Sequence, residues 1–126
     1  MSDPVYLTIE DLLGLVRALH AGPVRDLGLL DAAGARPRSS VFGEDAYATI
    51  ELKTAALLHS LVRNHALVDG NKRIAWLAAV VFLDLNGYRS SLNQDQAFAL
   101  VMSAAIGEID VPEIATALAI APKIDS

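Results

Sequence analysis

Cysteine is absent from this 126-residue chain, which excludes disulfide bonds and chemistry by a cysteine thiolate. Positive charge is also scarce. The 10 Lys and Arg residues are outnumbered by 15 Asp and Glu, and a net charge of −5 gives no basic field to attract nucleic acid. No cationic leader opens the sequence, and its longest apolar run, Ile74 to Leu83, falls well short of the roughly 20 residues that span a bilayer. These absences predict a soluble, cytoplasmic protein that contacts neither a membrane nor nucleic acid directly.

Apolar side chains, by contrast, are abundant. Hydrophobic residues make up 53% of the chain and charged residues 20%, a balance that predicts a compact fold rather than disorder. The length suits one hydrophobic core, and no linker, repeat or low-complexity tract divides the chain. We therefore expect residues 1–126 to form a single domain.

Apolar residues recur at helical spacing through most of the sequence, and capping residues, Gly and Pro mark the ends of the segments. The spacing predicts an all-α bundle of about five to seven helices. Residues 35–47 mix turn formers with β-branched and aromatic residues, and are expected to form a loop or short hairpin. The predicted helices run from Thr8 to near His20, from Asp31 to Pro37, from Thr49 to Asn64, from Asn71 to Asn86 with Gly87 following, from Asn93 or Asp95 to Gly107, and from Asp110 onwards.

A polar stretch, residues 63–73, separates two of the most apolar predicted helices. If the second of these begins near Asn71, its first N–H groups lack acceptors within the helix, and the helix dipole adds partial positive charge there. Such an end binds anions, and Gly70 leaves room for one to approach. The stretch therefore predicts a phosphate site.

Four charged or ionisable side chains of the stretch add chemistry to that site. Lys72 is a compact point charge, whereas Arg73 can bind phosphate oxygens in a bidentate manner. Asp69 offers a carboxylate to Mg²⁺, and His65 is the one side chain here that accepts a proton near neutral pH. A base, a metal ligand and a phosphate cradle are the parts needed to transfer a phosphoryl or nucleotidyl group to a hydroxyl.

Each of these residues also has a structural explanation when taken alone. Asp69 could cap a helix, and Lys72 with Arg73 could form a solvated first turn. We interpret His20 and His59 as structural, because each falls in a predicted helix without polar companions. The combination within nine residues is what favours a functional site over these alternatives.

The order His65-Ala-Leu-Val-Asp69-Gly70-Asn71-Lys72-Arg73 resembles the signature of the Fic/Doc family, His-Pro-Phe-x-Asp/Glu-Gly-Asn-Gly-Arg-x-x-Arg. Lys72, in place of the second Gly, is similar to the death-on-curing (Doc) branch of toxins. The resemblance extends over nearly the whole chain, through the segments Arg25–Asp31, Leu57–His65, Leu83–Tyr88 and Ala105–Ile109.

The resemblance implies an all-α Fic fold and a toxin paired with an antitoxin protein. It implies that His65 is the general base, that Asp69 holds Mg²⁺, and that residues 70–73, Gly70, Asn71, Lys72 and Arg73, bind the phosphates of ATP. Residues 36–47 would correspond to a flap that aligns a target segment beside the active site. Doc enzymes transfer the terminal phosphate of ATP to a threonine of elongation factor Tu and stop translation, whereas other Fic enzymes transfer AMP.

The chain departs from the signature at positions that bear on this choice. Trp76 stands where the signature has its second Arg, and Lys72 adds charge where AMP transferases have Gly. Both differences favour the phosphate-transferring branch, with AMP transfer and an inactive binding relative as alternatives. Ala66 and Leu67 replace Pro and Phe, and Leu67 is expected to serve as the apolar anchor of the loop. Arg63 precedes the core motif, and whether it assists the site is left open by the sequence.

Inhibitory helices of the family carry Ser/Thr-x-x-x-Glu-Gly/Asn. In this chain the nearest match, Ser40 to Glu44, continues with Asp45 and lies in the predicted flap. We therefore expect a separate antitoxin, with a disordered tail that folds as a helix into a surface groove.

Overall fold

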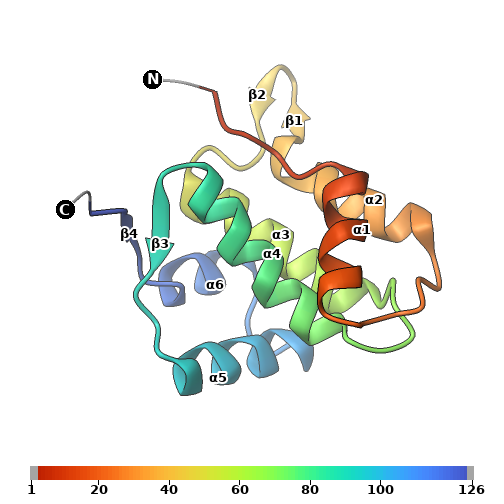
Figure 1. The fold of residues 1–126 in the computed structure, drawn as a ribbon. Coiled ribbons are helices and arrows are strands. Elements are labelled where there is room, and N and C mark those ends of the chain that lie inside the picture. The colour runs from red at the N-terminus through yellow and green to blue at the C-terminus, as the bar shows by residue number, and fades with distance from the viewer. Residues whose placement is uncertain (1–2, 125–126) are drawn as a thin grey trace.

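The computed structural model describes residues 3–124, which form six α-helices and two small antiparallel sheets (Figure 1). The all-α prediction is confirmed. The helices are α1 (Ile9–Ala18), α2 (Leu27–Ala35), α3 (Ile50–Asn64), α4 (Asn71–Leu85), α5 (Gln94–Ala105) and α6 (Val111–Ala117), with a 3₁₀ turn η1 (Arg36–Arg38) after α2. The strands are β1 (Ser40–Val41), β2 (Glu44–Asp45), β3 (Tyr88–Ser90) and β4 (Ile120–Pro122).

Helices α3 and α4 pack against each other at the centre of the bundle, with α1 and α2 on one side and α5 and α6 on another (Figure 1). Many side chains of the two helices are almost completely buried, including Leu58, Ile74 and Phe82. Full burial of such a side chain stabilises the fold by about 1.5–3 kcal/mol. The central pair therefore fixes the loop that joins it, residues 65–70, and this loop carries the predicted site.

Most predicted helix ends are confirmed by side-chain caps. Thr8, Thr49, Asn93 and Asp110 each accept a hydrogen bond from a first-turn N–H group. Gly87 follows α4 with a φ of 84°, the left-handed conformation that a helix end favours.

The predicted start of the second helix at Asp31 is wrong. Asp26 accepts a hydrogen bond from the Leu29 N–H at 3.0 Å, so α2 begins at Leu27. The apolar residues 27–30 form its first turn, and Leu30 is completely buried. Asp26 is a good capping residue, but the apolar run after it is too short to be recognised as helical from spacing alone.

Residues 40–45 form the expected hairpin, with Ser40 opposite Asp45 and Val41 opposite Glu44. Both turn residues, Phe42 and Gly43, have positive φ angles, as in a type I′ turn. The nearly buried ammonium of Lys53 on α3 holds the base of the hairpin, since it donates to the Tyr47 carbonyl at 2.6 Å.

The pairing of β3 with β4 was not predicted. Tyr88–Ser90 lies antiparallel to Ile120–Pro122, and Lys123 beyond it forms an ion pair with Asp84 at 2.5 Å. Strands this short show no alternation that sequence spacing could detect. Within residues 3–124, no helix combines the length and apolar character that crossing a membrane requires.

Candidate active site

Two residues with left-handed backbone begin and end the loop between α3 and α4. His65 ends α3 with φ 52° and ψ 47°, and Gly70 precedes α4 with φ 96°. A Cβ at Gly70 would lie 2.6 Å from the Cβ of Ala21 and 3.1 Å from Nη2 of Arg73. Only glycine fits this position, for its backbone angle and for the space.

The segment 22–26 runs antiparallel to this loop and hydrogen-bonds to it from one end to the other. The Gly22 N–H donates to the Asp69 carbonyl at 2.9 Å, and the Val68 N–H donates to the Pro23 carbonyl at 2.9 Å. At the other end the N–H groups of Arg25 and Asp26 donate to the Ala66 carbonyl. The loop is therefore held by a segment about forty residues earlier in the chain.

Leu67 is the apolar anchor that the sequence predicts. It is 2% exposed and packs with Val16 and Ile74 beneath the loop. The side chain of Asn71 closes the same turn, because its Oδ1 accepts from the Leu67 N–H at 3.0 Å and its Nδ2 donates to the Leu67 carbonyl at 2.9 Å. The amide of Asn71 thus shapes the loop.

The first turn of α4 has the properties of an anion site. The helical hydrogen bonds begin with the Ile74 N–H, which donates to the Gly70 carbonyl at 2.9 Å. Across residues 3–124, the N–H groups of Asn71, Lys72 and Arg73 have no hydrogen-bond acceptor in the chain. The two cationic side chains of this turn are exposed, and α4 directs its dipole at the same place.

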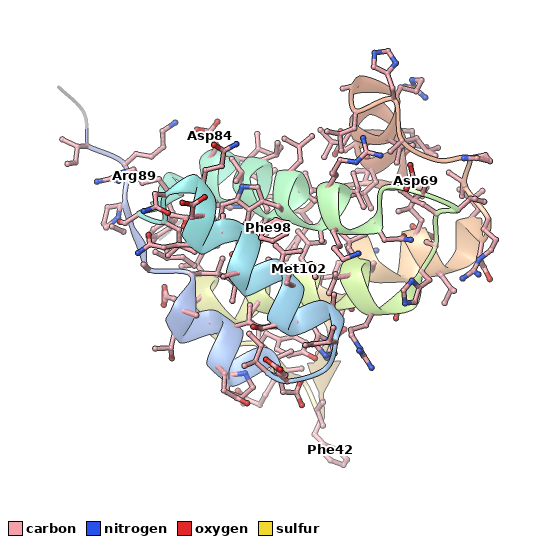
Figure 2. All side chains as sticks on the ribbon, turned by 90° about the horizontal axis from the view of Figure 1, so that it is seen from below. Phe42, Asp69, Asp84, Arg89, Phe98 and Met102 are labelled. Carbon is pink, nitrogen blue, oxygen red and sulfur yellow. The ribbon has the colours of Figure 1, made fainter. Side chains whose placement is uncertain are left out.

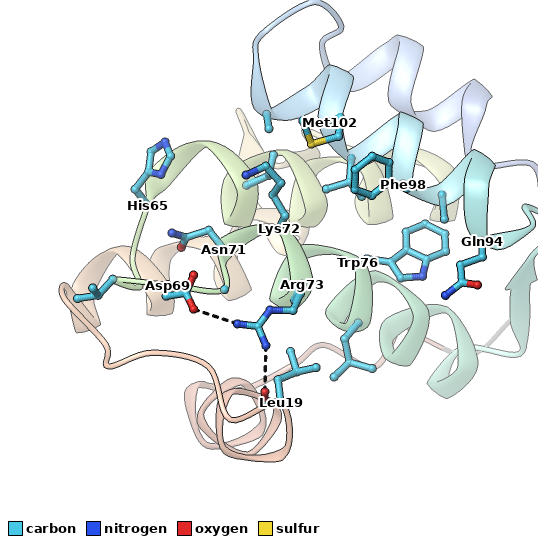
Figure 3. Close-up of a pocket in the computed structure, with 17 residues that line it drawn as sticks. Leu19, His65, Asp69, Asn71, Lys72, Arg73, Trp76, Gln94, Phe98 and Met102 are labelled. Atoms are coloured by element: carbon cyan, nitrogen blue, oxygen red, sulfur yellow. Dashed lines mark hydrogen bonds and ion pairs between the residues drawn. The ribbon is translucent and has the colours of Figure 1, made fainter.

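Arg73 connects this turn to its surroundings. Its Nη2 lies 3.2 Å from Oδ2 of Asp69, and its Nη1 donates to the Leu19 carbonyl at 3.1 Å (Figure 3). Both side chains of the ion pair are substantially exposed, 49% for Arg73 and 80% for Asp69. Water and ligands can therefore reach either partner.

The loop and the start of α4 line one end of a cleft of about 780 Å³. His65, Asp69, Asn71, Lys72 and Arg73 all border it (Figure 3). Its other wall is apolar and comes from Trp76 and Leu77 of α4 and from Ala97, Phe98, Val101, Met102 and Ala105 of α5.

The sequence did not predict the apolar wall of the cleft. Phe98 and Met102 are one helical turn apart on α5, and Phe98 is 68% exposed. Their spacing was a signal, but only the fold reveals that this face of α5 borders the motif instead of the core.

Comparison with known proteins shows the family of the chain. The model of the Fic/DOC family matches residues 6–83, more than half of the chain. The chain belongs to the Fic/DOC family. It is 49% identical over 118 residues to Toxin Doc of Mycolicibacterium smegmatis, an alignment that covers 90% of this chain and 91% of that protein. Enzymes of the family are protein-modifying transferases.

The Fic/DOC match ends within α4, whereas the cleft also includes residues of α5. Residues 94–105, which form α5 and the apolar wall, follow the matched region. The polar half of the cleft thus comes from the part of the chain that the family model covers, and the apolar half comes largely from beyond it.

The predicted Mg²⁺ ligand of the Fic/DOC motif suits that ion in part. Asp69 offers exposed carboxylate oxygens, the ligand type that Mg²⁺ prefers. Within residues 3–124 no group of three His, Asp or Glu side chains converges on a point. The site therefore fits a Mg²⁺ ion that keeps several water molecules and takes further ligands from substrate phosphates, as this ion commonly does.

The hairpin predicted as a flap is present, but it does not lie beside the motif loop. The hairpin 40–45 precedes α3 and the motif loop follows it, so the two adjoin opposite ends of a 15-residue helix that is about 22 Å long at 1.5 Å per residue. Phe42 at the hairpin tip lies at the far side of the molecule from Asp69 (Figure 2). Residues 36–47 do not line the cleft, and the chain segment that lies beside the motif loop is 22–26.

Arg63 contacts the end of a helix, and His59 differs from its predicted surroundings. Arg63 donates to the Ala105 carbonyl at 2.7 Å, where it caps the end of α5. His59 is not without polar companions, since Nδ1 lies 2.9 Å from Nη1 of Arg36 and Nε2 lies 3.5 Å from Asp110. Burial, with a smaller contribution from the charge of Arg36, lowers the pKa of His59. The remaining histidine, His20, follows α1 and is exposed.

Proposed function

We propose that this protein is the toxin of a type II toxin–antitoxin system and that it transfers the terminal phosphate of ATP to a hydroxyl of a protein. The target expected from the resemblance is a threonine of elongation factor Tu, whose modification would inhibit translation in the cytoplasm. The observation that carries the proposal is the cleft itself. It joins an exposed histidine to a helix N-terminus with free N–H groups and two cations in the part of the chain that the structure describes.

The chain's own residues account for each part of the transfer. His65 accepts the proton of the target hydroxyl while that oxygen bonds to the γ-phosphorus. The bond from this phosphorus to the oxygen shared with the β-phosphate breaks, and ADP leaves. The N–H groups of residues 71–73, with Lys72 and Arg73, stabilise the charge on the transferring and leaving phosphates.

Asp69 would hold Mg²⁺, and the ion would supply positive charge that neutralises the phosphates. Asp69 is paired with Arg73 at 3.2 Å. This ion pair places the guanidinium of Arg73 beside the carboxylate that would hold the ion. The carboxylate and the cation would then act on the same nucleotide.

AMP transfer is the second candidate, because the same base, carboxylate and anion site could serve it. Two residues favour phosphate transfer. Trp76 places an indole where the AMP-transferring signature has a cation, and this side chain borders the cleft. Lys72 adds a side chain and a charge at a position where that signature has Gly.

Label transfer separates the two reactions. The protein is incubated with Mg²⁺, elongation factor Tu and ATP labelled at either the α or the γ phosphorus. Transfer of γ label alone to the factor is expected. Transfer of α label would instead establish nucleotidyl transfer and refute the phosphate-transfer proposal.

The third candidate, an inactive binding relative, is tested in cells. His65→Ala and Asp69→Ala should each abolish growth arrest, because they remove the proton acceptor and the metal ligand at exposed positions where the fold does not depend on the side chain. Persistent arrest with both variants would favour a role in binding alone.

We further propose that the antitoxin covers the apolar half of the cleft. Phe98 and Met102, with Trp76 opposite, offer an apolar face of the kind that an amphipathic helix occupies. A helix seated there would also obstruct the nucleotide, so one contact would inhibit the toxin.

A further inference from the structure

The backbone of His65 is the joint between two halves of the candidate site. Its imidazole extends from the end of α3, whereas Asp69 and the phosphate-facing N–H groups belong to the loop and to α4. The ψ angle of His65, 47°, sets the direction in which the chain leaves α3. A change in this angle would move the base relative to the metal ligand and the anion site without altering either of them.

The joint needs support from outside the loop. A left-handed conformation at a residue other than glycine costs about 1–2 kcal/mol. The hydrogen bonds of Gly22 and Pro23 act at the Asp69 end of the loop. At the His65 end the support comes from Arg25.

Arg25 hydrogen-bonds to two consecutive carbonyls. Its backbone N–H donates to the Ala66 carbonyl at 2.7 Å, and its guanidinium donates to the His65 carbonyl. Fixing the His65 carbonyl fixes the peptide plane between His65 and Ala66, and the orientation of this plane defines the ψ angle of His65. The backbone bond remains after any substitution except proline, so a change of side chain tests the hold on this plane alone.

We propose that Arg25 is a positioning residue that holds His65 at the angle required for transfer. This inference rests on the proposed role of His65 as the base. Arg25 also places a cation at the C-terminal end of α3, which by itself stabilises a helix. A test therefore has to separate alignment of the base from stability.

The variants Arg25→Met and Arg25→Gln make this separation, since they are uncharged, similar in size and differ in the N–H donor. Both should fold, because Arg25 is exposed and its truncation opens no cavity. In the labelled transfer to elongation factor Tu, R25M should lower kcat about tenfold to a hundredfold, the range that misplacement by about 1 Å can cause. KM for ATP should stay unchanged, because the anion site lies on α4. R25Q and R25K should recover most of kcat.

Arg63→Ala is the matched control, since Arg63 also donates from its guanidinium to the carbonyl of a helix end, that of Ala105. It should lose comparable stability and keep kcat within about twofold of the unmodified protein. Equal losses of kcat in R63A and R25M would overturn the inference, as would a rise in KM with kcat unchanged.

If the proposed function is wrong, the role of Arg25 is tested separately. If α label is transferred, the variants are compared in that reaction, and the role of Arg25 is judged independently of which phosphate moves. If nothing is transferred, the NMR signals of the His65 ring and the amides of Ala66 and Leu67 are compared. R25M should shift or broaden them and R25Q should not. Identical spectra in the two variants would refute the positioning role.

Discussion

Single residues determine whether the motif loop can adopt its conformation. Gly70 combines a φ of 96° with direct contact against Ala21, so backbone conformation and space both require glycine there. Gly43 at the hairpin tip has a φ of 81°, but a Cβ added to it would meet no atom within 4 Å. The two glycines separate the effect of conformation from the effect of crowding.

Gly70→Ala should therefore lower the free energy of unfolding by about 2–4 kcal/mol, from left-handed strain plus displacement of Ala21. Gly43→Ala should lower it by only about 1–2 kcal/mol, from strain alone. Urea denaturation of the two variants measures both losses. Equal losses would mean that the Ala21 segment yields to the new methyl group without cost.

His59 is a second residue with an effect on the whole fold, because it makes stability depend on pH. It is half-buried beside Arg36 and Asp110, and burial with the charge of Arg36 lowers its pKa below 6.5. The unfolded chain consequently binds a proton at a higher pH than the folded chain does. The contribution of His59 to the free energy of unfolding is fully present above about pH 6.5, and it declines as pH falls through the lowered folded pKa.

His59→Asn should remove this part of the acid sensitivity. The difference in unfolding free energy between the unmodified protein and the variant should shrink as pH is lowered from about 7.5 to about 5, because only the unmodified protein loses the contribution of His59. Chemical denaturation at several pH values measures it. A difference that is constant over this range would show that His59 titrates alike in both states.

At the scale of elements, an asparagine side chain at each end of α4 hydrogen-bonds to the backbone of another segment. Asn71 exchanges two hydrogen bonds with the backbone of Leu67, and Asn86 exchanges two with the backbone of Val5, at 2.7 and 3.0 Å. The first pair shapes the motif loop, whereas the second holds the N-terminal segment at the opposite end of the helix.

Asn71→Ala and Asn86→Ala should each lose about 1–3 kcal/mol of stability, since each leaves backbone groups without partners. Only N71A should also reduce transfer and accelerate hydrogen exchange at the Leu67 amide. Activity assays with exchange measured by NMR test this contrast. A similar loss of transfer in N86A would imply that the site depends on α4 as a whole.

Elements with local signals could be predicted from the sequence. Thr49 and Asn93 cap helices where expected, because capping depends on residues three positions apart. The β3–β4 pair could not be predicted, since α5 and α6 separate Ser90 from Ile120 in the sequence. The site divides in the same way. Residues 65–73 were recognised as one stretch, but the contact of Arg25 depends on a neighbour forty positions away.

At the scale of the whole molecule, exposed aromatic side chains mark two separate faces. Phe98 borders the cleft, and Phe42 stands at the tip of the hairpin across the molecule (Figure 2). Both are largely exposed, at 68% and 101%. The proposed antitoxin surface includes the first of them and not the second.

Phe98→Ser should weaken binding of the antitoxin by about tenfold or more, as loss of an aromatic anchor commonly does. Phe42→Ser should leave binding unchanged. Calorimetric titration with the protein encoded beside the toxin gene measures both affinities, and rescue of growth by co-expression supplies the cellular counterpart. Unchanged affinity in F98S would place the antitoxin elsewhere.

The antiparallel contact between residues 22–26 and the motif loop has a consequence for how sites of this kind are recognised. A fragment beginning after Asp26 would contain every letter of the signature, yet it would lack the hydrogen bonds to Ala66 and Asp69 and the bond of Arg25 to His65. The nine residues of the signature supply the reacting groups, but residues earlier in the chain hold these groups in position. Two proteins with the same signature can thus differ in competence through residues that no motif contains.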